Sequence, residues 1–197
     1  SFMIKSARHG RVGTHADVTM TPRPLRLSLL ASVLLAATAF AGAPEEKIAQ
    51  LGLTLPTANA PVANYVTAVR TGNLIFLAGH IPRDAAGKVI AGKVGRGATE
   101  EDATAAAKQA TLALLATLKR EVGDLGKVKR IVRVGGFVNG TDDFQNQPKV
   151  MNGCSDLLVA VFGDRGRHAR AALGVNSLPL GALVEIEMVV EIGRAHV

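Results

Sequence analysis

The 197-residue sequence is poor in the residue types on which several functions depend. It contains no tryptophan, one tyrosine and one cysteine, and aromatic residues make up 4% of the chain. The single cysteine, Cys154, excludes an intramolecular disulfide and a metal cage built on cysteines, and its helix-like surroundings indicate a core residue. Proteins that bind single-stranded nucleic acids stack bases on exposed aromatic side chains, so the scarcity of aromatics argues against that function.

The chain also lacks the motifs of nucleotide, metal and serine-hydrolase sites. The glycine-rich run Gly92–Gly97 has neither the spacing nor the Lys-Ser/Thr ending of a phosphate-binding P-loop. No cluster of His, Asp and Glu residues has the spacing of metal ligands, so we expect no metal site. Neither Ser155 nor Ser177 lies in the context of a nucleophile elbow, which disfavours a Ser-His-Asp hydrolase.

A short apolar run near the N-terminus predicts export. Arg23 and Arg26 precede the run Leu27–Phe40, and Ala39-Phe40-Ala41 places small residues at the positions that a signal peptidase reads. This pattern is typical of a secretory signal peptide, and the run is short for a transmembrane span. We therefore predict a signal peptide over residues 20–41 and a periplasmic or secreted protein without membrane attachment after cleavage. A membrane anchor or a core helix are the alternatives, and the protein is cytoplasmic if the segment is not processed.

The remaining boundaries follow from this segment. Met20 is the natural initiator, so we interpret residues 1–19 as upstream or expression-derived sequence, residues 42–192 as one domain, and residues 193–197 as a C-terminal tail. Five cations and one anion fall in residues 1–41, which leaves a net charge of +3 out of +7 for the rest of the chain. Such a balance gives no indication of nucleic-acid binding.

Apolar periodicity and turn residues predict an α+β domain. The expected elements are a short helix over Glu45–Leu53, strands over Tyr65–Arg70 and Leu74–Ala78 around the turn Thr71-Gly72-Asn73, a long helix from Thr99 to Val122, a strand within Leu125–Val138, a second long helix over Lys149–Phe162, and strands beginning at His168 and Val184. The Gly135-Gly136 pair suggests a bulge or a close backbone approach. This order indicates a mostly antiparallel sheet with both long helices on one face.

The last two predicted strands place a cation and a carboxylate in one candidate site. Arg170 lies among small residues, which leave room beside a guanidinium whose fork of donors suits a carboxylate. The short connection before Val184 predicts a hairpin that returns Glu185 close to Arg170. The plainer alternative is a cross-strand ion pair with a structural role.

Several short motifs occur in an order and spacing that match a known family over about Ala49–Ile192. The motifs are Tyr65-Val66, Ala78-Gly79-His80-Ile81-Pro82, Phe137-Val138 before Asp143-Phe144, Ala169-Arg170, Leu178-Pro179 and Val184-Glu185-Ile186-Glu187. They resemble the Rid family of enamine/imine deaminases, also called YjgF-like or endoribonuclease L-PSP-like proteins. The segment Gly163–Arg170, Gly-x-x-Gly-x-His-Ala-Arg, is similar to that of one YjgF-like subgroup.

The resemblance implies a chorismate-mutase-like subunit that assembles as a homotrimer with clefts between subunits. It implies that Arg170 clamps the carboxylate of a small-molecule substrate, and that Glu185 positions or activates the water that attacks the imine carbon and releases ammonia. It further implies that Gly79 offers backbone groups to the substrate, that Tyr65 lines the cleft, and that Asn152 matches a polar cleft residue. No metal or organic cofactor is implied.

Two positions depart from the deaminase pattern of that family. Ala172 stands where a cysteine is frequent, and Ala78 stands where a serine is frequent, so two polar contributors to the cleft are missing. Three hypotheses therefore remain. The first is a 2-imino/2-enamino acid deaminase, and the second is a non-catalytic trimer that binds a small carboxylate or other metabolite in the same cleft. The third, a ribonuclease, is disfavoured by the modest charge and scarce aromatics. We interpret His168 as a packing residue at the strand start.

Overall fold

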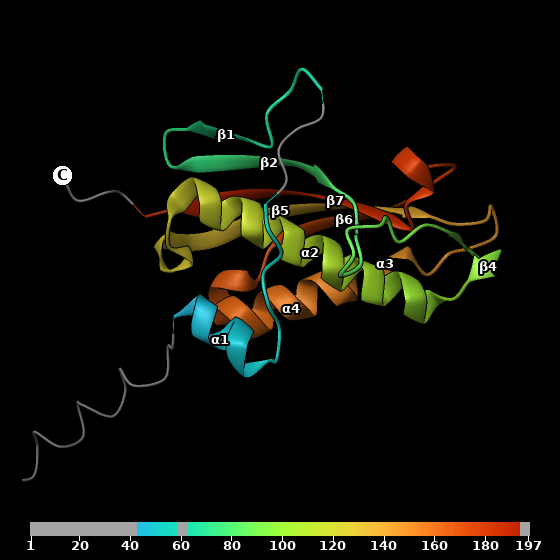
Figure 1. Cartoon of the computed structure of the whole chain (residues 1–197), viewed down its shortest axis with the longest axis horizontal. Coiled ribbons are helices and arrows are strands. Elements are labelled where there is room, and N and C mark those ends of the chain that lie inside the picture. The colour runs from blue at the N-terminus through green and yellow to red at the C-terminus, as the bar shows by residue number, and fades with distance from the viewer. Residues whose placement is uncertain (1–42, 59–62, 194–197) are drawn as a thin grey trace, which may run out of the picture. The chain divides into compact units, whose positions relative to one another are not determined.

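The computed structural model describes residues 43–58 and 63–193 (Figure 1). The predicted signal peptide, the residues before it and residues 194–197 of the predicted tail lie outside the described residues. Within the two described ranges, no helix combines the length and the apolar character needed to cross a membrane.

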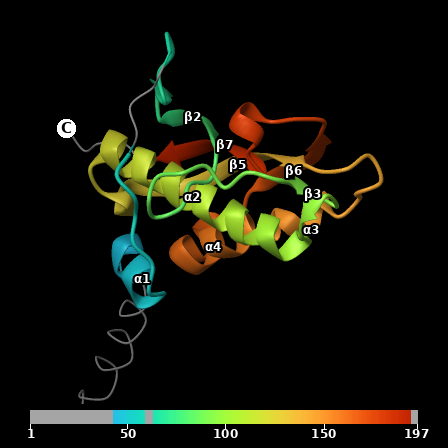
Figure 2. The same ribbon diagram turned by 45° about the vertical axis from the view of Figure 1, so that its right-hand side comes forward.

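The described elements follow the predicted order. They are α1 (Pro44–Gln50), β1 (Ala68–Thr71), β2 (Leu74–His80), β3 (Lys93–Val94), β4 (Gly97–Ala98), α2 (Glu100–Val122), β5 (Val128–Asn139), α3 (Gln147–Val150), α4 (Asn152–Phe162), β6 (Ala169–Val175) and β7 (Val184–Ile192), with short 3-10 turns at Leu125–Lys127, Gly163–Gly166 and Pro179–Gly181. Figures 1 and 2 both show α2 and α4 packed side by side against one face of the main sheet. This arrangement confirms the predicted α+β architecture, although the second long helix is interrupted at Met151.

The main sheet has the strand order β1-β2-β7-β5-β6. Its neighbours are antiparallel except for β5 and β6, which are parallel, so the sheet is mostly antiparallel as predicted. The predicted hairpin between the last two strands is wrong, because β5 lies between β6 and β7. The helices α3 and α4 carry the chain from β5 back to the start of a parallel neighbour, as parallel pairs require. The connection over residues 176–183 then crosses β5.

Helix α2 begins and ends where its sequence predicts. The Thr99 hydroxyl accepts a hydrogen bond from Asp102 N at 3.1 Å, and the Asp102 carboxylate accepts one from Thr99 N at 2.9 Å. This capping box satisfies backbone donors that have no partner inside the helix. Gly123 ends the helix at a positive φ of 78°, which costs glycine little.

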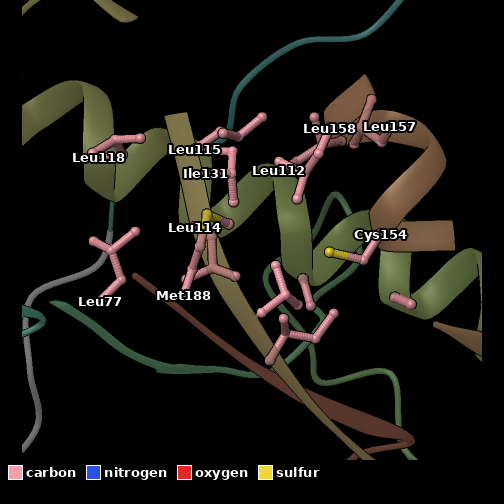
Figure 3. Packing of buried hydrophobic residues seen from close by; sticks show 14 of the residues in the cluster. Leu77, Leu112, Leu114, Leu115, Leu118, Ile131, Cys154, Leu157, Leu158 and Met188 are labelled. Atoms are coloured by element: carbon pink, nitrogen blue, oxygen red, sulfur yellow. The ribbon is translucent and has the colours of Figure 1, made fainter. Parts of the chain in front are cut away.

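The core lies between this helix layer and the sheet. Figure 3 shows Leu114 of α2 beside Ile131 of β5 and Met188 of β7. These three side chains and Leu118 of α2 are fully buried. Truncating such a side chain to alanine costs about 2–5 kcal/mol, so this layer fixes the position of the sheet on the helices. Cys154 is also buried here, as predicted, and burial raises the pKa of its thiol to about 11. The thiol is therefore protonated and unreactive at neutral pH.

Two local predictions need correction. Tyr65 and Val66 precede the first strand, which begins at Ala68. The pair Gly135-Gly136 forms no bulge, because β5 keeps a regular register with both neighbours there. The atoms that approach these glycines closely belong to side chains and not to the backbone. A Cβ at Gly136 would overlap the side chain of Met151, and one at Gly135 would lie 2.6 Å from Glu187 Oε1.

The face of the sheet away from the helices carries large apolar side chains that solvent reaches in the single chain. Val69 of β1 pairs with Phe76 of β2, and these residues are 52% and 45% exposed. Leu173 of β6, on the same face, is 53% exposed. Exposed apolar side chains that are aligned across neighbouring strands are typical of surfaces that another chain covers.

Candidate active site

Arg170 lies on the helix side of the sheet. Arg170 pairs with Val134 on β5, and Val134 pairs with Met188 on β7. Val134 and Met188 are fully buried against the helices, so Arg170 faces the same side. Arg170 Nη1 donates to Asn152 Oδ1 at 2.9 Å and to Ser155 Oγ at 3.0 Å, both on α4. These two bonds occupy both hydrogens of Nη1. Among the described residues, no acceptor bonds Nε or Nη2, so this edge of the guanidinium is available for a bidentate carboxylate.

Ser155 links Arg170 to His168. His168 Nε2 lies 3.1 Å from Ser155 Oγ, and His168 Nδ1 lies 2.7 Å from the carbonyl oxygen of Gly166. Burial lowers the pKa of His168, the bond to Gly166 opposes this shift, and the charge of Arg170 adds to it. His168 is thus a hydrogen-bonded member of the site, and its interpretation as a packing residue is incomplete.

Glu185 lies on the opposite face of the sheet. Its neighbours Val184 and Ile186 are buried toward the helices, so the alternation of side chains along β7 directs Glu185 away from them. Its carboxylate lies over Gly79, where β2 is irregular, and a Cβ at Gly79 would overlap Glu185 Oε1. Burial and the charge of Glu187 raise the pKa of the Glu185 carboxyl above its ordinary value. A carboxyl with a raised pKa is suited to taking up and returning a proton.

A groove of about 1290 Å³ runs past Glu185. Tyr65, Gly79 and Glu185 line it together, whereas Arg170 and Asn152 do not. The structure therefore divides the predicted site residues into two groups within one chain. The first group surrounds the groove, and the second, Arg170 with Asn152, lies on the other face of the sheet. The expectation that one hairpin places Arg170 beside Glu185 is wrong for a single chain.

His80 also lines the groove, but both of its ring nitrogens are engaged. Nδ1 lies 2.8 Å from the Ala78 carbonyl oxygen, and Nε2 lies 2.8 Å from the hydroxyl of Thr117. A carbonyl only accepts, so Nδ1 carries the proton and Nε2 accepts from the threonine. Burial lowers the pKa of His80; the bond to Ala78 opposes this shift, and the charge of Arg120 adds to it. His80 thus ties the irregular end of β2 to α2 and is not free to exchange protons with a ligand.

Sequence reasoning did not single out Ser155, which bonds Arg170, or Glu187, whose charge acts on Glu185, as members of the candidate site. A helical signal for Ser155 existed, because residues three apart share one face of a helix and Asn152 is three residues earlier. Glu187 is two residues from Glu185 on one strand, so both carboxylates share a face. Over the part of the chain that the structure describes, no three His, Cys, Asp or Glu side chains are grouped to hold a metal ion.

The chain matches known proteins over this whole domain. Protein TCP17 of Trypanosoma cruzi is 40% identical over 146 residues, which are 74% of this chain and 91% of that protein. A protein named 2-iminobutanoate/2-iminopropanoate deaminase from Dermatophagoides farinae is 27% identical over 141 residues, which are 71% of this chain and 94% of that protein.

Solved structures agree with this match. The crystal structure of Atu1372 from Agrobacterium tumefaciens, described as a protein of unknown function, is 40% identical with a TM-score of 0.71, over 77% of this chain and 94% of that one. The family model described as "YjgF/chorismate_mutase-like, putative endoribonuclease" matches residues 45–192. The chorismate-mutase-like fold that the motifs implied is thereby confirmed, and the chain belongs to the YjgF/chorismate mutase-like family.

Proposed function

We propose that the protein hydrolyses 2-imino acids, and the 2-enamino acids that tautomerise to them, in clefts between subunits of a homotrimer. Water adds to the imine carbon, the carbon–nitrogen bond breaks, and a 2-oxo acid and ammonia leave. The observation that carries this proposal is the guanidinium of Arg170. It is held by α4 through one nitrogen while a complete bidentate edge remains available. The similarity to a protein named as a deaminase of this class supports the same reaction.

Arg170 is suited to the carboxylate that every 2-imino acid carries. The Nε and Nη2 hydrogens form a planar fork that matches two carboxylate oxygens. Asn152 acts in this proposal by holding Nη1 rather than by touching the substrate. A substrate bound in this way has its imine carbon at a fixed distance from the guanidinium, which favours attack from one direction.

Glu185 is the proposed acid and base. As a carboxylate it removes a proton from the attacking water, and as a carboxylic acid it returns a proton to the departing amine. Its raised pKa supports both roles, because the protonated form persists to higher pH than for an exposed glutamate. An imine is already electrophilic, so binding, orientation and one such group are sufficient chemistry.

The proposed cleft requires two copies of the chain. Since Arg170 and Glu185 lie on opposite faces of the sheet, the carboxylate anchor of one subunit would meet the groove of its neighbour. A contact between two different surfaces closes into a ring when copies repeat it, and a ring of three is the assembly that the family resemblance implies. Val69, Phe76 and Leu173 are exposed apolar side chains on the sheet face away from the helices, the face that carries Glu185. They support burial of that face between subunits.

A second candidate function is a trimer that binds a small carboxylate without turnover. Ala78 and Ala172 favour it, because both positions lack the polar side chains that are frequent in the deaminase pattern. Under this alternative, Arg170 binds the ligand in the same way, and no ammonia is released.

The deciding experiment supplies 2-imino acids from an amino-acid oxidase while semicarbazide traps the imine that is not hydrolysed. The protein should reduce the trapped product, and Arg170→Ala should lower kcat/KM by at least about 100-fold. Arg167→Ala is the matched control, because Arg167 is exposed in the same segment and, within residues 43–58 and 63–193, its side chain bonds only Asp164. A folded protein without effect on imines from several amino acids would contradict the deaminase and favour the binding alternative.

A further inference from the structure

The segment Gly163–Arg170 has a further use that the proposed reaction does not by itself require. We propose that Ser155 and His168 form a relay, anchored on the Gly166 carbonyl, that positions Arg170 for the substrate carboxylate. Neither residue needs to touch the substrate, so both are positioning residues. The inference rests on the proposed function only in naming the carboxylate as the group that Arg170 binds.

The direction of each hydrogen bond follows from the chemistry of its partners. The Gly166 carbonyl can only accept, so His168 Nδ1, at 2.7 Å, carries a proton. In the neutral ring Nε2 then has a lone pair, and the Ser155 hydroxyl, at 3.1 Å, donates to it. The lone pairs of Ser155 Oγ are left for Arg170 Nη1 at 3.0 Å. Each hydrogen in this series of bonds has one acceptor, so the hydroxyl hydrogen of Ser155 points toward His168 and its oxygen faces Arg170.

Gly166 makes this geometry possible. It is buried, and a Cβ on it would overlap the carbonyl oxygen of Leu158 in α4. The backbone of the 3-10 turn therefore lies directly against the helix that carries Ser155, one turn earlier. The glycine, histidine and arginine of the Gly-x-x-Gly-x-His-Ala-Arg segment thus act as one unit: the glycine docks on α4, its carbonyl fixes the imidazole, and the imidazole fixes the hydroxyl that holds Arg170.

The relay matters because Arg170 is exposed on an edge strand. An arginine side chain that is free to rotate loses about 2 kcal/mol of rotamer entropy when a ligand fixes it. Two acceptors on Nη1 restrict the side chain before the substrate arrives, and they leave the Nε–Nη2 edge in one orientation. Such preorganisation raises affinity without adding a contact to the ligand. Its loss should therefore weaken carboxylate binding and change kcat little, since the anchor acts in the ground state and the transition state alike.

The test measures binding of a 2-oxo acid, 2-oxobutanoate, by calorimetry and imine hydrolysis by the trapping assay. Ser155→Ala and His168→Leu should each raise the Kd and the KM about five- to tenfold, with kcat within about twofold. Ser155→Thr keeps the hydroxyl and should stay within about twofold of the wild type. His168→Gln keeps an acceptor near the Nε2 position but loses the Nδ1 donor to Gly166, so it should lose less affinity than His168→Leu. Asp156→Ala is the matched control, because Asp156 is exposed on the same helix.

Three outcomes distinguish the relay from a packing role and from a failure of the proposed function. If Ser155→Ala and His168→Leu bind 2-oxobutanoate as the wild type does, the relay is wrong while the proposed function stands. If the conservative variants lose affinity as fully as the disruptive ones, the residues act through packing and the relay is again wrong. If the wild type neither binds 2-oxobutanoate nor hydrolyses imines, the proposed function itself fails. Thermal unfolding of each variant identifies any that does not fold, and the other member of the relay then provides the test.

Discussion

Arg170 and Glu185 lie on opposite faces of one sheet, on strands that β5 separates. Arg170 contacts α4 through Asn152 and Ser155, whereas Glu185 lies over Gly79 beside the groove. The sheet itself stands between the two side chains, so a single chain does not bring the two proposed site residues together. The proposed reaction therefore depends on the assembly as much as on the residues.

Mixing two inactive variants should restore activity. Arg170→Ala keeps an intact Glu185 half-site, and Glu185→Gln keeps an intact Arg170 half-site. When the two are unfolded together in equal amounts and refolded, about a quarter of the clefts in a ring should receive both intact halves and regain activity. The trapping assay measures the recovery, and each variant refolded alone is the control. A mixture as inactive as its components, with mixed oligomers demonstrated by mass, would place both residues of each site in one chain.

Glu187→Gln should shift the pH dependence of kcat to lower pH. The pKa of Glu185 is raised first by burial and then by the charge of Glu187, so removing that charge lowers the pKa by part of the total shift. Glu187 pairs with Arg133 at 2.7 Å, and the cation left behind acts in the same direction. Rate measurements across the acid limb provide the readout.

Glu191→Gln is the control for this prediction. It removes a carboxylate from the same face of β7 and breaks the ion pair with Lys129, at 2.7 Å, but it lies farther along the strand from Glu185. The acid limb should not move in this variant. If both variants move it equally, the effect is one of overall charge and not of the Glu187–Glu185 pair.

Local features of the fold could be predicted from the sequence, whereas the pairing of distant strands could not. Thr99 and Asp102, three residues apart, form the capping pattern that predicts the start of α2, and the buried side chains of this helix recur with a helical period. The neighbours of β6 are not encoded locally, because an eight-residue connection can close a hairpin or cross a strand. The parallel pair of β5 and β6 is explained by the helical segment that connects them in sequence. Our prediction instead relied on the short connection before β7 and paired β6 with β7.

The candidate site divides in the same way. Motif order identified Tyr65, Gly79 and Glu185, and these residues do meet at one groove. The contact between Ser155 and His168 depends on how the turn Gly163–Gly166 docks on α4, which is a tertiary event. No spacing in the sequence reports it, because the two residues belong to different elements.

Acid should destabilise the folded protein from about pH 6.5 downward. Burial lowers the pKa of His80 from its ordinary value of 6.5, so as the pH falls the unfolded chain takes up a proton before the folded chain does. The stability that this group contributes is complete above pH 6.5 and is lost as the pH falls toward the lower folded-state pKa. Urea unfolding at several pH values between 8 and 5, on the wild type and on His80→Gln, measures the effect. The variant should show a smaller decrease over this range, and an equal decrease in both proteins would exclude His80 as a cause.

Alanine at two glycines should separate activity from stability. A Cβ at Gly79 would meet the carboxylate of Glu185, the movable end of a flexible side chain, so Gly79→Ala should displace that group and lower kcat while leaving thermal stability nearly unchanged. A Cβ at Gly153 would instead meet the backbone carbonyl of Thr104 where α4 packs on α2. That carbonyl cannot move without the helix, so Gly153→Ala should cost about 1–3 kcal/mol of unfolding free energy. Unfolding curves and imine hydrolysis on both variants give the comparison. A fully active Gly79→Ala protein would show that the carboxylate of Glu185 does not need its place over Gly79.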